Sequence, residues 1–280
     1  MNYPGNCYSI LQNIRYAINE HSTALVQGTD TTGAFQNSYL IDEINKAQYF
    51  IYSILFTTMP DLFLTSASLT FSSSVATLPV DCFKIREIDD SEGIPLTAID
   101  MGQRHVGTYT GDKYAYYRYG NSIHIDRDSI SETGTIWYYK RLREITTGMS
   151  SAGGALTLTL ASTSKGIIDY YNNMTIENIT DNWVDTISDY TAARVCTLAA
   201  QTGAASKYYG IVSELPEIFH NVLEERAIIQ VKQHPKAPFK ITQQDLVLNM
   251  ENLRFAMTAY AGTNTGDVNV DNTINDFGGL

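Results

Sequence analysis

Apolar and polar positions recur with a helical period at both ends of the chain. Near the N-terminus, apolar side chains return every three or four positions over Cys7–His21 and Gln36–Thr57, which is the period of an amphipathic helix. The same period returns over Ser213–Pro235 and Thr242–Gly262. Neither pair of helices can bury its apolar stripe alone, so we expect all four to pack into one antiparallel bundle. The last helix carries the narrowest stripe, formed by Leu246, Met250, Leu253, Met257 and Tyr260.

Between the two helical pairs the period of apolar residues falls to two. Short runs of this kind extend from Leu62 to Arg141 and predict strands, with a hairpin turn at Gly120-Asn121. A Gly/Ser-rich stretch, Thr146–Gly154, is interpreted as a linker to a smaller β module.

The predicted fold class is α+β: an antiparallel bundle of four helices, two at each end of the chain, with a large inserted β region and an extended C-terminal tail. The expected divisions are residues 1–60 (N-terminal helix pair), 61–145 (β-sheet or sandwich region), 146–210 (inserted small β module), 211–262 (C-terminal helix pair completing the bundle) and 263–280 (extended tail).

The tail, Thr263–Leu280, has a composition of its own. It contains three Asp and no Lys or Arg, and it is rich in Asn, Gly and Thr. A disordered tail is one interpretation of this composition. The regular spacing of its apolar residues favours another, in which the tail is extended and docks on a neighbouring subunit. The candidate contact residues are Val268, Val270, Ile274, Phe277 and Leu280.

The overall composition limits the classes of function. Of 280 residues, 19 are Lys or Arg and 30 are Asp or Glu, which gives a formal net charge of −11. This charge disfavours a protein that grips nucleic acid with a broad basic face. Three separated cysteines argue against a disulfide framework or a zinc knuckle. No apolar run approaches the length of a membrane span and the first residues lack a basic, apolar leader, so we expect neither a membrane protein nor a secreted one.

The sequence holds no recognisable catalytic motif. Neither HExxH nor G-x-S-x-G occurs, and the phosphate-loop pattern that begins at Gly148 lacks its Lys. The five histidines have no ligand spacing and are expected at surfaces or interfaces, and Glu87–Glu92, Asp126/Asp128 and Glu224-Glu225-Arg226 are interpreted as solvated surface. We therefore assign no catalytic, cofactor-binding or metal-binding residue and expect a structural protein without a cofactor rather than an enzyme. A hydrolase with an Asp/Glu acid and base stays open, although no such pair can be named.

Basic residues gather in two places. Lys140-Arg141-Arg143 ends a predicted strand, and Lys232, Lys236 and Lys240 surround the end of a predicted helix. The first group could contact DNA or an acidic partner subunit, but structural ion pairs are the favoured interpretation.

Five segments, taken in their order along the chain, resemble one family. They are the predicted helix Ser38–Pro60, the strand junction Leu78–Phe83, the hairpin Tyr117–Ile125, the aromatic strand Ile136–Leu142 and the helical return from Leu215. In this order they resemble the head-to-tail adaptor (connector or neck) proteins of tailed bacteriophages, of the type called tail tubular protein A in short-tailed phages.

A second resemblance covers the small β module. Asp169–Ile176 and Ile187–Leu198 resemble a module common in phage neck, tail and fibre proteins, with Asn173 and Ala192 at positions where glycine is usual. Asn adopts a positive φ readily, whereas Ala does so only at a cost, so we expect the turn at Ala192 to differ from the usual one.

The first resemblance implies a structural virion protein that joins the head to the tail. Such adaptors form a ring of twelve copies beneath the portal. In such a ring the tail Thr263–Leu280 would reach a neighbouring subunit or the portal. The implied partners are further copies of the chain, the portal protein, the next tail or nozzle protein on the side of the β region, and a tail fibre as a further candidate. Genomic DNA would pass through the lumen during ejection without specific binding, because twelve copies would carry a formal charge of about −130 and repel phosphates. The implied location is the neck or tail of the virion, after assembly in the host cytoplasm, with no membrane contact.

An alternative function is a peripheral virion module, of fibre or decoration type, that binds a receptor or a glycan. Glycan sites need exposed aromatic rings beside carboxylates, and Tyr114, Tyr116 and Tyr117 lie near Asp112 in the sequence. Packing within the predicted strands and contact between subunits are the competing interpretations of these tyrosines.

Overall fold

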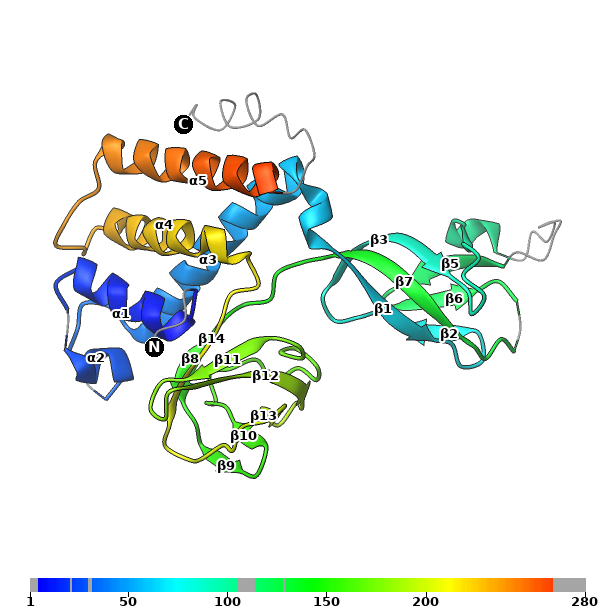
Figure 1. The fold of residues 1–280 in the computed structure, drawn as a ribbon, viewed down its shortest axis with the longest axis horizontal. Helices are drawn as coiled ribbons and strands as arrows, with labels where there is room; N and C mark the ends of the chain where they lie inside the picture. The colour runs from blue at the N-terminus through cyan, green and yellow to red at the C-terminus, as the bar shows by residue number, and fades with distance from the viewer. Residues whose placement is uncertain (1–4, 21, 30–31, 105–113, 128, 264–280) are drawn as a thin grey trace. The chain divides into compact units, whose positions relative to one another are not determined.

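The computed structural model describes residues 5–20, 22–29, 32–104, 114–127 and 129–263 (Figure 1). The chain divides into two compact units. The first is built from Met1–Met59 together with Leu142–Leu280, and the second from Pro60–Arg141. The first unit therefore joins segments from both ends of the chain.

Five helices occur among the described residues of the first unit. They are α1 (Cys7–Ala17), α2 (Thr23–Gln27), α3 (Asn37–Thr58), α4 (His220–Gln233) and α5 (Gln243–Thr263). Helices α1, α3 and α5 all pack against α4, which lies among them (Figure 1). One face of α3 supplies much of the core, because its side chains at helical spacing are fully buried: Leu40, Ile44, Ile51 and Leu55.

The first unit also contains an antiparallel sheet of seven strands. In sheet order these are β8 (Thr147–Met149), β14 (Tyr208–Ile211), β11 (Thr175–Asn178), β12 (Trp183–Tyr190), β13 (Val195–Leu198), β10 (Thr157–Thr159) and β9 (Ala152–Gly154). Buried tyrosines fill its interior. The rings of Tyr171 and Tyr190 meet edge to face with centroids 4.9 Å apart, and the hydroxyl of Tyr209 hydrogen-bonds to Ser164 at 2.8 Å and accepts the N–H of Ala161 at 3.0 Å.

Asn6 connects this sheet to the helices. Its Oδ1 accepts the N–H of Tyr8 at 2.7 Å and so caps α1, while its Nδ2 donates to the buried carboxylate of Glu177 in β11. Gly210 in β14 leaves the space for this contact, because a Cβ there would lie 1.8 Å from Asn6 Oδ1. The start of α1 is therefore fixed on the sheet.

The second unit is built from strands and two short 3-10 helices. Its elements are η1 (Pro60–Phe63), β1 (Leu64–Thr70), β2 (Val75–Thr77), β3 (Cys82–Asp89), β4 (Thr97–Ala98), η2 (Met101–Gln103), β5 (Ala115–Tyr119), β6 (Ser122–Ile125) and β7 (Thr133–Lys140). They form a three-stranded sheet, β1-β7-β3, and a four-stranded sheet, β2-β6-β5-β4. One apolar core serves both sheets, with Leu69, Phe71, Ile88, Ile123 and Ile136 among its members.

The predicted fold class, a four-helix bundle with an inserted β region, is wrong. The described residues form a mixed α/β protein that is predominantly β-rich, with five helices and fourteen strands in three sheets, the largest a seven-stranded half-barrel. The stretch Thr146–Gly154, predicted to be a linker, contributes strands β8 and β9. Its glycines belong to strands because backbones approach closely there: a Cβ on Gly153 would lie 2.4 Å from the backbone nitrogen of Ala204.

The helix boundaries near Ser213 and His21 also differ from prediction. Ser213 does not cap a helix. Its hydroxyl donates to Gln48 Oε1 at 2.6 Å and accepts the N–H of Leu215 at 3.2 Å, and α4 begins only at His220. Helix α1 ends at Ala17 because Asn19 adopts a left-handed conformation with φ of 62°.

Three turn predictions have clear outcomes. The Gly120-Asn121 hairpin is confirmed, with Tyr119 paired to Ser122 across it. Asn173 has φ of 64°, as predicted for asparagine in place of glycine. In the turn that contains Ala192 the positive φ falls on Arg194 (66°) instead, so the chain avoids the strain that alanine would meet.

Candidate functional site

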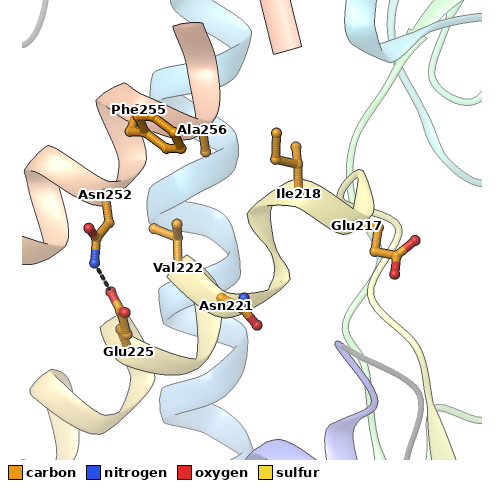
Figure 2. Close-up of a pocket in the computed structure, with 8 residues that line it drawn as sticks. All are labelled: Glu217, Ile218, Asn221, Val222, Glu225, Asn252, Phe255 and Ala256. Atoms are coloured by element: carbon orange, nitrogen blue, oxygen red, sulfur yellow. Dashed lines mark hydrogen bonds between the residues drawn. The ribbon is translucent and has the colours of Figure 1, made fainter. Parts of the chain in front are cut away.

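A groove lies between α4 and α5 in the first unit. It has a volume of about 600 Å³. The short 3-10 helix η3 (Glu217–Phe219), which leads directly into α4, completes one end of it. Figure 2 shows the residues that line it: Glu217, Ile218, Asn221, Val222, Glu225, Asn252, Phe255 and Ala256.

The groove combines a buried apolar floor with exposed apolar walls. Val222 and Ala256 are each 4% exposed, whereas Ile218 is 41% and Phe255 is 77% exposed. Phe255 is the most exposed large apolar side chain among the described residues. A single exposed apolar residue is ordinary, whereas two that line one groove enlarge the apolar surface exposed there.

Glu225 connects α4 to α5 along the side of the groove. Asn252 Nδ2 donates to Glu225 Oε2 at 2.8 Å, as Figure 2 marks, and Asn249 Nδ2 lies 3.4 Å from the same oxygen. Asn249 also donates to the backbone carbonyl of Val222 at 3.3 Å. These bonds hold the two helices at a fixed separation, so the groove is present before any partner arrives.

The neighbouring residues on α4 are less solvated than predicted. Arg226 places its guanidinium carbon 3.8 Å from the centre of the Phe50 ring on α3, and its Nε is buried without a hydrogen-bond partner. Burial lowers the pKa of Arg226 and raises the pKa of Glu224. The prediction that Glu224-Glu225-Arg226 forms a solvated helix face is therefore wrong, because α4 is covered by three other helices.

The polar groups of the groove are acidic and amide side chains. Its polar lining consists of two carboxylates and two amides, and among these lining residues no nucleophile stands beside a base. Carboxylates next to apolar walls suit a partner that presents an apolar side chain together with cations.

The groove was not predicted from the sequence. The apolar stripe of the last helix was predicted, and two of its residues, Leu253 and Met257, are confirmed as fully buried. Phe255 lies between these two in sequence and therefore on the other side of the helix. The sequence did contain one sign of an exposed surface, namely an aromatic residue, Phe255, that does not belong to the apolar stripe. The groove also needs Ile218, which the prediction placed inside one continuous helix.

The predicted contact residues of the tail cannot be placed. Val268, Val270, Ile274, Phe277 and Leu280 all lie outside the described residues.

The structure separates the tyrosines that the sequence grouped as a candidate glycan site. Tyr116 is 8% exposed and belongs to the core of the second unit. Tyr117 follows it in β5, and successive strand residues point to opposite faces of a sheet, so these two rings cannot line one site. Tyr114 is half-buried and packs against Arg127, whose guanidinium carbon lies 5.2 Å from the ring centre. Asp112 lies outside the described residues.

A different aromatic group reaches the surface of the second unit. The ring of Tyr117 stacks on that of His124, with centroids 5.2 Å apart and an interplanar angle of 11°. Tyr119, which is 61% exposed, meets His124 from the edge at 6.1 Å. The sequence did not suggest this group because His124 comes from the opposite strand of the hairpin, β6.

In the acidic stretch Glu87–Glu92, two aspartate side chains accept hydrogen bonds. Asp90 Oδ1 accepts the N–H groups of Glu92 at 2.9 Å and Ile94 at 2.8 Å, which closes a turn. Asp89 Oδ2 accepts the indole N–H of Trp137 at 2.9 Å. Asp128 of the second stretch lies outside the described residues.

The basic group Lys140-Arg141-Arg143 divides between the two units. Arg143 belongs to the first unit, is 6% exposed and forms a 2.7 Å ion pair with Glu214. The predicted structural ion-pair role is therefore confirmed for Arg143.

Three of the five histidines, His124, His220 and His234, lie among the described residues. His220 is buried, with Nε2 2.7 Å from the carbonyl oxygen of Leu215, and is not the surface or interface residue predicted. His21 and His105 lie outside the described residues. Within the described ranges, no three His, Cys, Asp or Glu side chains come together in a way that could hold a metal ion.

No described helix is both long and apolar enough to cross a membrane.

Comparison with known proteins adds no relative to this picture. No protein-family model matches the chain, and no curated protein matches it significantly.

Proposed function

We propose that this chain is a structural virion protein of a tailed bacteriophage, an adaptor whose copies form a ring between the portal and the tail. In this role its surfaces bind other subunits and it carries out no reaction. Its partners are further copies of the chain, the portal and the next tail component, and genomic DNA passes through the lumen of the ring.

The observation that carries the proposal is the order of the segments that resemble adaptor proteins. In the structure, Ser38–Pro60 corresponds to α3, Leu78–Phe83 to the junction that leads from β2 into β3, Tyr117–Ile125 to the β5–β6 hairpin and Ile136–Leu142 to β7. The helical return from Leu215 corresponds to η3, α4 and α5.

The exposed apolar side chains of α5 support a subunit that is covered by neighbours. Besides Phe255, the residues Val247 and Leu248 are 50% and 53% exposed. Exposed apolar area concentrated on one helix is typical of protein–protein contact surfaces.

The net charge of −11 is compatible with a channel for DNA. Carboxylates around a lumen repel phosphates, so DNA would pass without adhering. The repulsion between copies opposes assembly, and the subunit interface has to overcome it.

Electron microscopy of the purified chain, alone and with the portal protein encoded by the same genome, tests the proposal. We expect closed rings, either free or seated on the portal. A chain that remains monomeric and never binds the portal ring contradicts it. Binding of the chain to a glycan array, with no ring and no portal contact, would favour the receptor-binding alternative instead.

A further inference from the structure

The hairpin formed by α4 and α5 has two chemically opposite ends. At one end lies the groove, with Glu217 and Glu225 beside the exposed side chains of Ile218 and Phe255. At the other end lies the loop His234–Thr242, which joins the two helices. The two ends differ in the sign of their charge.

The loop presents an aromatic ring between two cations. Phe239 is 51% exposed, and Lys236 and Lys240 are exposed on either side of it in sequence. The combination of an apolar ring with ammonium groups matches what the groove is suited to bind.

Contacts within the loop hold it in one conformation. Lys240 Nζ donates to the carbonyl oxygens of His234 and Pro235, both at 3.0 Å. Ala237 is 5% exposed and fixes the loop to the unit. The ring of His234 packs against Phe35, with centroids 5.1 Å apart. An ordered loop loses little conformational entropy on binding.

The loop cannot fill the groove of its own chain. The groove residue of α4 that lies nearest to the loop in sequence is Glu225. The eight residues Arg226–Gln233 separate it from the loop, which corresponds to roughly 12 Å at a rise of 1.5 Å per residue. Because the contacts described above hold the loop in place, it reaches such a groove on another copy.

We propose that the loop of one copy inserts Phe239 into the α4–α5 groove of the next copy, with Lys236 and Lys240 facing Glu217 and Glu225. This inference rests on the proposed function, in which copies assemble into a ring. Because the two surfaces differ, the contact is head-to-tail, and repeated contacts of this kind close into a ring when the rotation between copies allows it.

Charge favours the loop His234–Thr242 over the C-terminal tail as the segment that occupies the groove. Residues 264–280 contain three Asp and no Lys or Arg, so the tail would bring negative charge to the two groove carboxylates. The loop brings positive charge instead, and complementary charge directs a contact to the correct partner.

Two single substitutions and their mixture test the head-to-tail contact. Phe239→Asp removes the apolar ring of the loop and leaves the groove intact, whereas Phe255→Asp alters the groove and leaves the loop intact. We expect each to weaken self-association about 30-fold or more, as for a residue at the centre of an interface. Because each variant keeps the surface that the other lacks, an equimolar mixture should form heterodimers that do not grow further.

Tyr119→Asp is the matched control, since it places the same charge at a ring that is 61% exposed on the second unit. It should assemble like the unaltered chain. Circular dichroism verifies that all variants are folded, and analytical ultracentrifugation, with and without the portal protein, measures their size.

In a second pair, Lys236→Glu and Glu217→Lys should each weaken association, and a mixture of the two should recover it through the exchanged charges.

The outcomes separate the inference from the proposed function. If the unaltered chain assembles and both Asp variants assemble equally well, or if their mixture forms no heterodimer, the inference is wrong and the proposed function stands. If deletion of residues 264–280 abolishes association while the Phe239 variant still assembles, the tail occupies the groove and the inference is wrong. If the unaltered chain is monomeric at every concentration and never binds the portal, both are wrong.

Discussion

Arg143 and Glu214 form a two-point ion pair between segments 71 residues apart in sequence. The Nη2 of Arg143 lies 2.7 Å from Oε1 of Glu214, and its Nε donates to Oε2 at 3.0 Å. The remaining Nη1 donates to the carbonyl oxygens of Tyr170 at 3.1 Å and Asn172 at 2.6 Å. One buried side chain thus joins the strand-bearing segment of the first unit to the segment that leads into η3 and α4.

Removing the cation of this pair should destabilise the first unit strongly. Arg143→Met removes the guanidinium that compensates the charge of the buried Glu214 carboxylate, and we expect the free energy of unfolding to fall by about 3–5 kcal/mol. Lys165→Met is the control, because its 2.7 Å pair with Glu144 is partly exposed, with side chains 43% and 35% accessible, and should contribute about 0–1 kcal/mol. Urea unfolding measures both, and equal losses in the two variants would contradict the importance of the buried pair.

Gly210→Ala should be among the most damaging of the small substitutions. The added Cβ would lie 1.8 Å from Asn6 Oδ1, so either the α1 cap or the sheet has to shift. We expect a loss of at least 2 kcal/mol, about the cost of a lost cap and a broken buried hydrogen bond combined. Gly102→Ala is the control, because a Cβ there meets nothing within 4 Å. Thermal unfolding compares the two, and a Gly210→Ala midpoint as high as that of the control would show that the contact is not needed.

Much of the helical structure could be predicted because periodic patterns become distinct over long segments. Helices α3 and α5 run for 22 and 21 residues, and their predicted limits lie within one or two residues of the observed ones. Strands β8 and β9 are each three residues long, which is too short for a period of two to appear. Glycine at Gly153 then suggested a linker, although the close approach of two backbones is the reason for it.

The candidate site could not be predicted because it depends on a tertiary contact. Ile218 and Phe255 are 37 positions apart in sequence. The helical period placed Ile218 on the buried stripe of the helix predicted from Ser213, and this prediction is wrong, because Ile218 is 41% exposed. The common groove of Ile218 and Phe255 appears only when η3 and α5 both pack against the same helix. The buried stripe of α5 could be predicted, since Leu253 and Met257 follow the helical period within one segment.

Phe255 should contribute little to stability, although it is a large apolar residue. At 77% exposure it transfers little area from water, so Phe255→Ser should change the free energy of unfolding by no more than about 0.5 kcal/mol. Leu253→Ala, two residues earlier on the buried face, should cost about 2–5 kcal/mol. Chemical denaturation of the two variants measures the difference. A large loss of unfolding free energy in Phe255→Ser would mean that this side chain packs within its own subunit and is not a free contact surface.

Stability should fall at alkaline pH because of the buried tyrosines in the seven-stranded sheet. Burial raises the pKa of Tyr209 from 10.0 to about 12 and also raises the pKa values of Tyr171 and Tyr190. An unfolded tyrosine ionises near pH 10, so above that pH the unfolded state loses protons that the folded state retains. The stabilisation by these neutral phenols is fully present below about pH 10 and is lost as the pH rises toward 12.

Urea unfolding at a series of pH values, followed together with the ultraviolet absorbance of tyrosinate, checks this expectation. Tyr209→Phe removes one such group and should make stability less steeply dependent on pH above 10, although it also loses the 2.8 Å hydrogen bond to Ser164. Titration of every tyrosine near pH 10 without loss of structure would contradict the burial of these phenols.

Removal of residues 264–280 should weaken assembly and leave the melting temperature nearly unchanged. The cut follows the end of α5 at Thr263, so the shortened chain keeps every helix and strand that the structure describes. If the apolar residues of the tail attach it to a neighbouring subunit or to the portal, their loss lowers only the affinity between chains.

A full-length variant with serine at Val268, Val270, Ile274, Phe277 and Leu280 keeps the length and the charge of the tail and removes only its apolar side chains. It should assemble as poorly as the truncated chain when both are measured by portal binding. Normal assembly of the serine variant together with poor assembly of the truncated chain would assign the effect to the length or charge of the tail. Normal assembly of both would show that the tail contributes nothing to the ring, and a lowered melting temperature would show that it packs on its own subunit.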